Sequence, residues 1–443
     1  MNRRQFIKNS AVVGAMVGLP AVIPSTALGK DGAAAPSDRA AIGLIACGNR
    51  ARYAGRYKQY AKSEVVAVCD PIDWRRLHFK KMFGNCADHV DFRELLGRKD
   101  VDAVHIATAD HWHVPIALMA AKAGKDMYTE KPLGISIAHD LESRKIVDKH
   151  KRVFQYGAQQ RSSVYPRMGI ELVLNGHIGE VKEILVKCPK GHSGGSGQPV
   201  MPVPKGVNYD LWLGPAPKAP FCADRVLYQP GKWWIERNGI YHIHDYAIGF
   251  IAGWGAHPMD MLQWWADNSG MKELIPVKYE GKGTVPTKGL FNTVTHWDVS
   301  CQYANGIKMR FMDNDTAGKL KLHKGFRGGI AVLFIGTDGW VRVSRGGWET
   351  SSKALTQKAR NPGKKRLIVS TDQITNFVDC VLSRKTPVDD LHSAVRSDVA
   401  THLCDIAIRT GRPITWDSKA ETIKGDADAA KMMARQLRKP WTL

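Results

Sequence analysis

Short apolar runs alternate with helical patterns between residues 41 and 155, and this alternation constrains the fold more than any other feature of the chain. The runs "AIGLIAC", "EVVAVCD", "AVHIAT", "KDMYTE" and "KRVFQYG" have the length and composition of buried strands. Segments with helical spacing, such as "DWRRLHFKKMFG" and "VPIALMAAKAG", lie between them. Repeated strand–helix alternation predicts an α/β fold with a parallel sheet and right-handed crossovers. We expect this domain to occupy residues 39–155.

The turn after the first predicted strand, "ACGNRA", resembles the G-x-G-x-x-G/A fingerprint of dinucleotide-binding sheets. Ala46 stands where the fingerprint has its first glycine, and Gly48 matches the second. Asp70 ends the next strand, where a carboxylate accepts hydrogen bonds from the adenosine ribose and repels a 2′-phosphate. The pattern therefore favours NAD. Arg75 and Arg76 follow closely and keep NADP as the alternative.

Strand-like segments follow in the second half of the chain, at 181–188, 277–285, 297–312 and 328–344. Several contain glycine turns such as "ANG" and "TDG". They come after the alternating half, as a segregated α+β layer would. We therefore expect a second, α+β domain over residues 156–443.

The start of the chain has the layout of a twin-arginine export signal. Arg3 and Arg4 precede a weakly apolar run and a small-residue cleavage site, "ALG". The run is short of the roughly 20 residues that a spanning helix needs, and Pro20 interrupts it. We expect a signal peptide at 1–29, a linker at 30–38, no stable membrane span, and a periplasmic or otherwise exported mature protein.

The chain of 443 residues has a formal net charge of +22, which raises the question of an acidic partner. Its lysines and arginines are spread along the chain, without a long basic run or an RNA-binding signature. A solvated basic surface is the simpler interpretation, and we expect no nucleic-acid partner. The eight cysteines contain no CxxC pair, which argues against a zinc ribbon or a thioredoxin-type motif.

Four longer segments then identify a resemblance. They are "DHWHVPIALMAAKAGKDMYTEKPLG" at 110–134, "LWLGPAP" at 211–217, "GWGAHPMDMLQWW" at 253–265, and the segment from "NFVDC" to "PITWD" at 376–417. In this order they resemble the Gfo/Idh/MocA family of glucose–fructose oxidoreductases and inositol dehydrogenases. The resemblance implies a Rossmann domain followed by an α/β domain with a large open, mainly antiparallel sheet. It also implies a homo-oligomer, a dimer or tetramer formed through that sheet.

Two catalytic residues are implied by the resemblance. The lysine of the Glu-Lys-Pro turn, Lys131, points at the substrate hydroxyl in the family, and burial beside a cofactor would lower its pKa. His257 matches the histidine of the second site motif, whereas the aspartate four residues before it is replaced by Gly253. His242, His244 or Asp245 could occupy the position in the folded site that the aspartate has in the family. Solvated loop side chains are the simpler alternative for these three.

The remaining candidate contacts come from both halves. For the cofactor they are Gly48, Asn49, Arg50, Asp70, Thr108, His111, Trp112, His113, Glu130, Lys131 and Gln160. For the substrate they are Lys131, Arg161, Trp233, Trp234, Tyr241, His244, Asp245, Trp254 and His257. Aromatic faces stack on sugar rings, although tryptophans are as readily core residues, as we expect for Trp264 and Trp265. The alternative interpretation of Gln160 and Arg161 is that they belong to a polar linker between the domains.

A metal site is the competing interpretation of Asp110, His111 and His113, because an H-x-H spacing can chelate an ion. In the family, however, this loop follows the carboxyl end of a strand and lies against the cofactor, where a doubly wound sheet binds its ligand. We therefore expect these side chains to line the cofactor site and expect no metal.

Three functions remain open at this stage. The first is an exported NAD-dependent oxidoreductase that transfers hydride between a tightly bound nicotinamide and a hydroxyl of a sugar, sugar derivative or polyol. The second is an NAD-dependent glycoside hydrolase of the same family, which oxidises, eliminates, hydrates and reduces in turn, unlike two-carboxylate glycosidases. The third is a non-catalytic sugar-binding protein, against which the retention of Lys131 and His257 argues.

Overall fold

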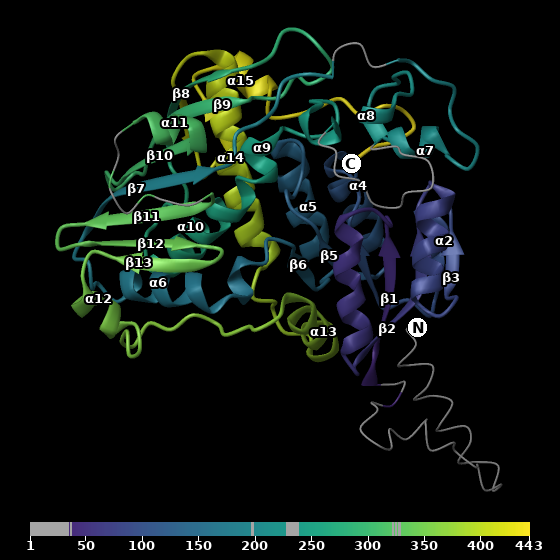
Figure 1. Cartoon of the computed structure of the whole chain (residues 1–443), viewed down its shortest axis with the longest axis horizontal. Helices are drawn as coiled ribbons and strands as arrows, with labels where there is room; N and C mark the ends of the chain where they lie inside the picture. The colour runs from purple at the N-terminus through teal and green to yellow at the C-terminus, as the bar shows by residue number, and fades with distance from the viewer. Residues whose placement is uncertain are drawn as a thin grey trace, which may run out of the picture.

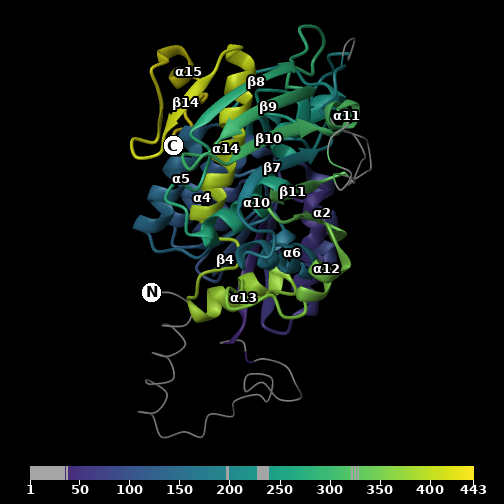
Figure 2. The same cartoon turned by 90° about the vertical axis from the view of Figure 1, so that its left-hand side faces the viewer.

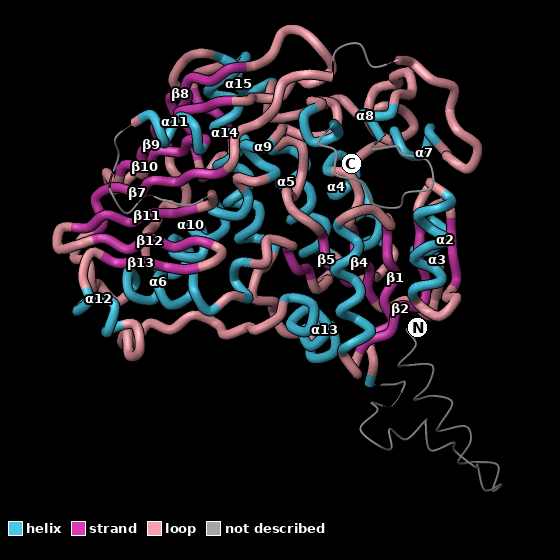
Figure 3. Tube along the Cα trace, viewed as in Figure 1, coloured by secondary structure: helices cyan, strands magenta, loops and turns pink. Residues whose placement is uncertain are grey.

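Two sheets lie side by side in the molecule, one in each half of the chain (Figures 1 and 3). The structure is a computed structural model, and it describes residues 35, 38–195, 199–226, 239–320, 323, 326 and 329–443. The predicted signal peptide lies outside the described residues, as does nearly all of the predicted linker. Within the described part, no helix has the length and apolar character required to cross a membrane.

The first sheet has six parallel strands in the order β3-β2-β1-β4-β5-β6, which is the order of a Rossmann fold. The strands are β1 (Ala40–Ile45), β2 (Ser63–Cys69), β3 (Ala87–His89), β4 (Ala103–Ile106), β5 (Asp126–Thr129) and β6 (Phe154–Tyr156). The connecting helices are η3 (Arg50–Gln59), α2 (Asp73–Met82), α3 (Phe92–Gly97), α4 (Asp110–Lys122) and α5 (Ile137–Lys149). All six residues of β1 are buried, because helices cover both faces of this sheet.

The second sheet has nine strands in the order β13-β12-β11-β7-β10-β9-β8-β14-β15. They are β7 (Val181–Cys188), β8 (Lys278–Thr284), β9 (His296–Gln302), β10 (Lys308–Asp313), β11 (Ala331–Gly336), β12 (Trp340–Ser344), β13 (Gly347–Thr350), β14 (Ile414–Asp417) and β15 (Thr422–Lys424). Only the β7–β10 pair is parallel among the pairs described. The predicted fold class, a Rossmann domain plus a large, mainly antiparallel sheet, is confirmed.

Long helices lie between the large sheet and the Rossmann domain (Figures 1 and 2). α6 (Val164–Leu174), α10 (Ala256–Ser269) and α14 (Leu391–Thr410) pack on the sheet, and α14 also contacts α5. Asp390 begins α14 by accepting a hydrogen bond from the backbone N–H of Ser393, and Gly411 ends it in the left-handed conformation. The shorter helices are η4 (Gln160–Ser162), α7 (Tyr209–Leu213), α8 (Ala223–Val226), η5 (Gly239–His242), α9 (Phe250–Gly253), α11 (Asn314–Lys319), α12 (Lys353–Lys358) and α15 (Ala427–Lys431).

One helix of the second half, α13 (Gln373–Ser383), returns to the first domain. Its buried side chains, Phe377 among them, share a core with β1 and η3. Polar contacts hold it there as well: Tyr128 donates to the Gln373 side-chain oxygen at 3.0 Å, and Tyr60 donates to Asp379 at 2.7 Å. The core of the Rossmann domain therefore contains side chains from both halves of the sequence.

The predicted strands are present, whereas two local features differ from the sequence prediction. The segment after the fingerprint turn forms a 3-10 helix, η3, whose first turn has no side-chain cap. The short strand β3 carries no apolar run, since all three of its residues are partly exposed at the sheet edge. Edge strands of this kind leave little hydrophobic signal in a sequence.

Candidate active site at the carboxyl end of the parallel sheet

A crevice opens at the carboxyl ends of β1 and β4, where the strand order of the parallel sheet reverses. This is the position at which open α/β sheets bind their ligands. With its open mouth the crevice encloses about 940 Å³. Of the predicted site residues, Gly48, Asn49, Arg50, Asp70, Thr108, Trp112 and Tyr241 line it.

The turn after β1 has the geometry that a diphosphate requires. Ala46 adopts the left-handed conformation, with φ of 74°, where the fingerprint has its first glycine. A Cβ on Gly48 would meet no other atom within 4 Å, so the backbone there is open to a ligand. The residues present therefore fit a dinucleotide, although Ala46 holds its conformation at a cost that glycine would avoid.

Asp70 fixes the same turn to the end of β2. Its carboxylate accepts hydrogen bonds from the backbone N–H of Cys47 at 2.7 Å and of Ile72 at 2.8 Å. Burial raises the pKa of Asp70, and the nearby Arg75 guanidinium partly offsets this rise. Arg75 lines the crevice too, so the arginine that keeps NADP open as an alternative lies at the expected place.

His113 links the two turns that face the crevice. Its Nδ1 lies 2.7 Å from the carbonyl oxygen of Pro132, and its Nε2 lies 3.2 Å from that of Thr108. His111 points elsewhere, because its Nε2 lies 3.3 Å from the Trp212 carbonyl oxygen and its ring lines a second cavity. The two histidines thus do not converge on one point as ligands of a metal would.

Among the described residues, Asp140, Asp398 and His402 are the ligating side chains that approach one another closely enough to share an ion. They are different side chains from those of the predicted cluster, although His402 lines the same second cavity as His111. Asp398 accepts hydrogen bonds from the backbone N–H groups of Leu133 and Gly134, directly after the Glu-Lys-Pro turn. The carboxylate thereby holds that turn in place.

Lys131 lies among charged groups, two of which, Arg50 and Asp110, line the crevice. Its Nζ donates to the carbonyl oxygen of Gly253 at 2.6 Å, and Glu130 beside it pairs with Arg50 at 2.8 Å. Burial, followed by repulsion from Arg50, lowers the pKa of Lys131 to about 8. Burial also raises the pKa of Asp110 to about 7, against an opposing effect of Lys131. The lysine is thus poised to gain or lose a proton near neutral pH.

His257 is buried behind Lys131 and both of its ring nitrogens are occupied. Nδ1 lies 2.9 Å from the Ala158 carbonyl oxygen and 2.8 Å from the Gln160 side chain, while Nε2 lies 2.9 Å from Nη2 of Arg345. Because a carbonyl only accepts and a guanidinium only donates, the proton sits on Nδ1 and Nε2 accepts. Burial, followed by Lys131, lowers the pKa of His257 well below its usual range.

Arg345 is a site residue that the sequence did not identify. It follows β12 in the turn before β13, about ninety residues after His257 in the chain. The hairpin "WVRVSRGGWET" reads as strand and glycine turn, and nothing in it marks one arginine as functional. Only the pairing of β12 with β11 brings this turn to the site.

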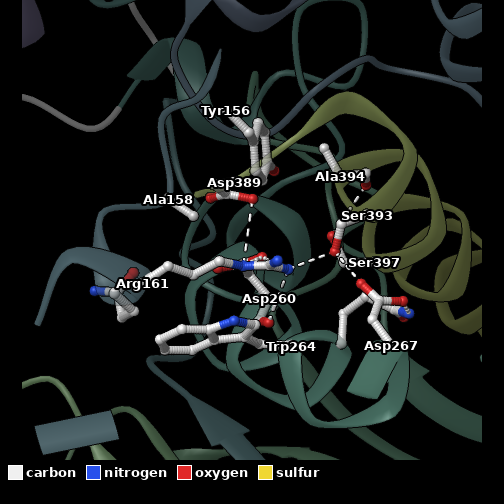
Figure 4. A network of polar contacts seen from close by, with 12 residues as sticks. Tyr156, Ala158, Arg161, Asp260, Trp264, Asp267, Asp389, Ser393, Ala394 and Ser397 are labelled. Atoms are coloured by element: carbon white, nitrogen blue, oxygen red, sulfur yellow. Dashed lines mark hydrogen bonds and ion pairs between the residues drawn. The ribbon is translucent and has the colours of Figure 1, made fainter. Parts of the chain in front are cut away.

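Arg161, a predicted substrate contact, lies in a buried polar network (Figure 4). Its Nε donates to Asp260 at 2.8 Å and lies 3.4 Å from Asp389, and its Nη2 also donates to Ser393. Burial raises the pKa of both aspartates, and the neighbouring Asp260 carboxylate raises that of Asp389 further. The network joins η4 to α10 and α14. A substrate contact from Arg161 stays a prediction.

The other predicted residues lie in different places. Trp254 stacks near Arg345, and Tyr241 faces the crevice. His244 and Asp245 line the second cavity, of about 930 Å³, where His244 contacts Arg435. Trp264 and Trp265 are core residues, as predicted. Trp233 and Trp234 lie outside the described residues.

The crevice, its fingerprint turn and the second domain beside it define a two-domain dinucleotide-binding protein. Residues 40–158 match an oxidoreductase family with an NAD-binding Rossmann fold, and residues 172–335 and 361–443 match its C-terminal α/β domain. The chain belongs to the Gfo/Idh/MocA oxidoreductase family.

Curated relatives resemble part of the chain. A glycosyl hydrolase family 109 protein from Shewanella sp. (strain W3-18-1) is 28% identical over 206 residues, 41% of this chain and 44% of the relative. A second such protein, from Shewanella sp. (strain ANA-3), is 31% identical over 158 residues, 31% of this chain and 34% of the relative. The chain thus matches less than half the length of these relatives.

Solved structures resemble nearly all of it. The WlbA dehydrogenase from Bordetella pertussis, solved with NADH and UDP-GlcNAcA, has a TM-score of 0.62 at 13% identity and covers 86% of this chain and 99% of its own. The myo-inositol 2-dehydrogenase from Lactobacillus plantarum has a TM-score of 0.57 at 16% identity, covering 85% and 99%. At these identities the likeness establishes the fold.

Proposed function

We propose that this protein is an NAD-dependent oxidoreductase that acts on a hydroxyl group of a sugar, sugar derivative or polyol. The observation that carries the proposal is the position of Lys131, beside the dinucleotide crevice and among charges that bring its proton affinity close to neutral. A nicotinamide nucleotide held in the crevice would supply the hydride acceptor for the carbon that bears the hydroxyl. The WlbA dehydrogenase, which holds NADH and a sugar nucleotide in a similar fold, supports this choice of substrate class.

Lys131 is the residue to which we assign the proton transfer. In its neutral form the amine donates one hydrogen to the Gly253 carbonyl, which restricts the directions in which the lone pair on Nζ can point. That lone pair receives the proton of the substrate hydroxyl. His257 is a weaker base with both nitrogens occupied, so we assign it the role of positioning Arg345 and Gln160.

NAD is the cofactor that we propose, in preference to NADP. Asp70 stands at the end of β2, in the crevice, where a carboxylate disfavours a 2′-phosphate. We also propose that the mature protein is exported and keeps its cofactor tightly bound, because free dinucleotide is scarce outside the cytoplasm. Denaturing the purified protein and identifying the released nucleotide by mass tests which nucleotide is bound and whether it stays bound through purification. Absence of stoichiometric nicotinamide would count against the function.

A second candidate function is an NAD-dependent glycoside hydrolase. The similarity to glycosyl hydrolase family 109 proteins, 28% identical over 206 residues, favours it. The two functions differ in their net redox change. Release of an aglycone without a lasting change in nicotinamide absorbance would identify the hydrolase, whereas stoichiometric reduction of the bound nicotinamide by a free sugar would identify the oxidoreductase.

A further inference from the structure

Arg345 presents an uncompensated positive charge at the candidate active site. Its Nη2 donates to Nε2 of His257 at 2.9 Å, and its guanidinium carbon lies 5.6 Å from the centre of the Trp254 ring. Both contacts orient the planar guanidinium, and neither neutralises it. Within the part of the chain that the structure describes, Arg345 forms no ion pair with a carboxylate, and its side chain remains exposed to solvent.

Arginines elsewhere in the same sheet are paired. Arg342, three residues earlier on the same hairpin, lies 3.0 Å from Glu349, and Arg310 on β10 makes two hydrogen bonds to Asp298. The hairpin therefore supplies a carboxylate to one arginine and leaves the other without one. The missing counter-charge is specific to the position that faces the site.

The charges around Arg345 add to this asymmetry. Lys131 feels the positive charges of both Arg50 and Arg345. Glu130 is already engaged with Arg50, and Asp110 is the remaining carboxylate near Lys131. Three cations and two carboxylates thus meet here, and the excess positive charge lies on the Arg345 side.

We propose that Arg345 binds an anionic group on the substrate, a carboxylate or a sulfate ester, so that the enzyme acts on acidic sugars. This inference rests on the proposed oxidoreductase function and narrows its substrate class. The guanidinium fork matches the two oxygens of a carboxylate or sulfate, and Trp254 beside it offers a flat apolar surface for the sugar ring.

The cofactor does not explain this charge. Its diphosphate belongs at the Gly48 turn of the first domain, and Arg345 does not line that crevice. Arg345 comes instead from the second domain and contacts His257, and its charge acts on Lys131, the residue to which the proposed function assigns the hydroxyl proton. We therefore expect the substrate to provide the negative charge that pairs with Arg345.

Binding to the NAD-loaded full-length protein tests the inference without relying on turnover. The probes are the methyl glycosides of glucose, galactose and mannose, each compared with its uronate and its 6-sulfate, and Kd is measured by calorimetry. We expect at least one anionic probe to bind about 10- to 100-fold more tightly than its neutral partner, the range of one hydrogen bond to a charged group. Whether the uronate or the sulfate gains the advantage identifies the anion.

Arg345→Gln should reduce this advantage to about one-fold, while Arg345→Lys should keep part of it. Arg310→Gln, a paired arginine on the same sheet, is the matched control and should keep the advantage in full. Equal affinity of wild type for charged and neutral probes overturns the inference, as does an advantage that survives in Arg345→Gln.

These failures differ from a failure of the proposed function. If neutral sugars reduce the bound nicotinamide and acidic sugars gain nothing, the inference is wrong and the oxidoreductase assignment stands. If the purified protein holds no nicotinamide nucleotide, the proposed function is wrong, whatever the sugar affinities are.

Discussion

One turn of α10 separates two polar sites that are built in opposite ways. Asp260 belongs to the network in which Arg161 is enclosed by two buried carboxylates, so the guanidinium is satisfied within the protein. His257, three residues earlier, faces Lys131 and Arg345, where the cations exceed their partners. A network that pairs its buried cation with carboxylates of the protein holds helices together, whereas a site whose cations lack such partners is prepared for a ligand.

The largest expected effect comes from replacing Lys131, in the site whose cations lack carboxylate partners. Lys131→Met should lower turnover by about 10²- to 10⁴-fold, because it removes the group that takes the hydroxyl proton. The amount of nucleotide that co-purifies should not change. Rates of sugar-dependent nicotinamide reduction measure the effect, with Lys190→Met as a control at an exposed lysine paired with Asp315. Turnover that survives in Lys131→Met would refute the proton-transfer role.

The second test replaces Arg161, in the buried network with Asp260 and Asp389. Arg161→Met leaves Asp260 and Asp389 buried without their cation, and we expect it to cost about 3–5 kcal/mol of unfolding free energy. Arg310→Met, which removes a partly exposed pair, should cost about 0–1 kcal/mol. Chemical denaturation measures both. An unchanged midpoint together with a raised KM would instead make Arg161 a substrate contact.

The pH dependence sharpens the assignment of the proton to Lys131. Substrate oxidation requires the neutral amine, so log kcat/KM should rise by about one unit per pH unit below pH 8 and level off above it. Reduction of the carbonyl requires the protonated amine and should fall above pH 8. The control is Lys131→Met, whose residual rate should lose the slope. A profile governed by a group near pH 6 would point to a histidine instead.

The smallest expected effect lies at the fingerprint turn. Ala46→Gly relieves a left-handed backbone conformation that costs a side chain about 1–2 kcal/mol, and it loses about 0.5–1 kcal/mol to the greater freedom of unfolded glycine. We expect a net stabilisation of about 1 kcal/mol or less, seen as a higher Tm. Gly48→Ala is the contrasting variant: its Cβ meets no protein atom, so it should alter nucleotide affinity more than stability.

The sequence predicted the architecture well because strand and helix periods leave strong local signals, as in "AIGLIAC" and "VKEILVKC". It placed Gly48, Asp70 and Lys131 near the cofactor crevice because these residues sit in local motifs at strand ends. Sequence analysis did not identify Arg345, because the position of that residue beside the distant His257 depends on how the strands of the second sheet pair. The sequence also could not show that both ring nitrogens of His257 are hydrogen-bonded, because their partners, Ala158 and Arg345, lie far from it in the chain.

The return of α13 to the first domain affects the order in which the chain acquires its structure during synthesis. N-terminal domains generally fold first, as they leave the ribosome. Here Phe377 and its neighbours on α13 complete the core beside β1, yet they are translated more than two hundred residues after β6. A nascent chain that already contains the whole parallel sheet still exposes the apolar surface which α13 will cover. Completion of the nucleotide-binding half therefore waits until α13 has been translated.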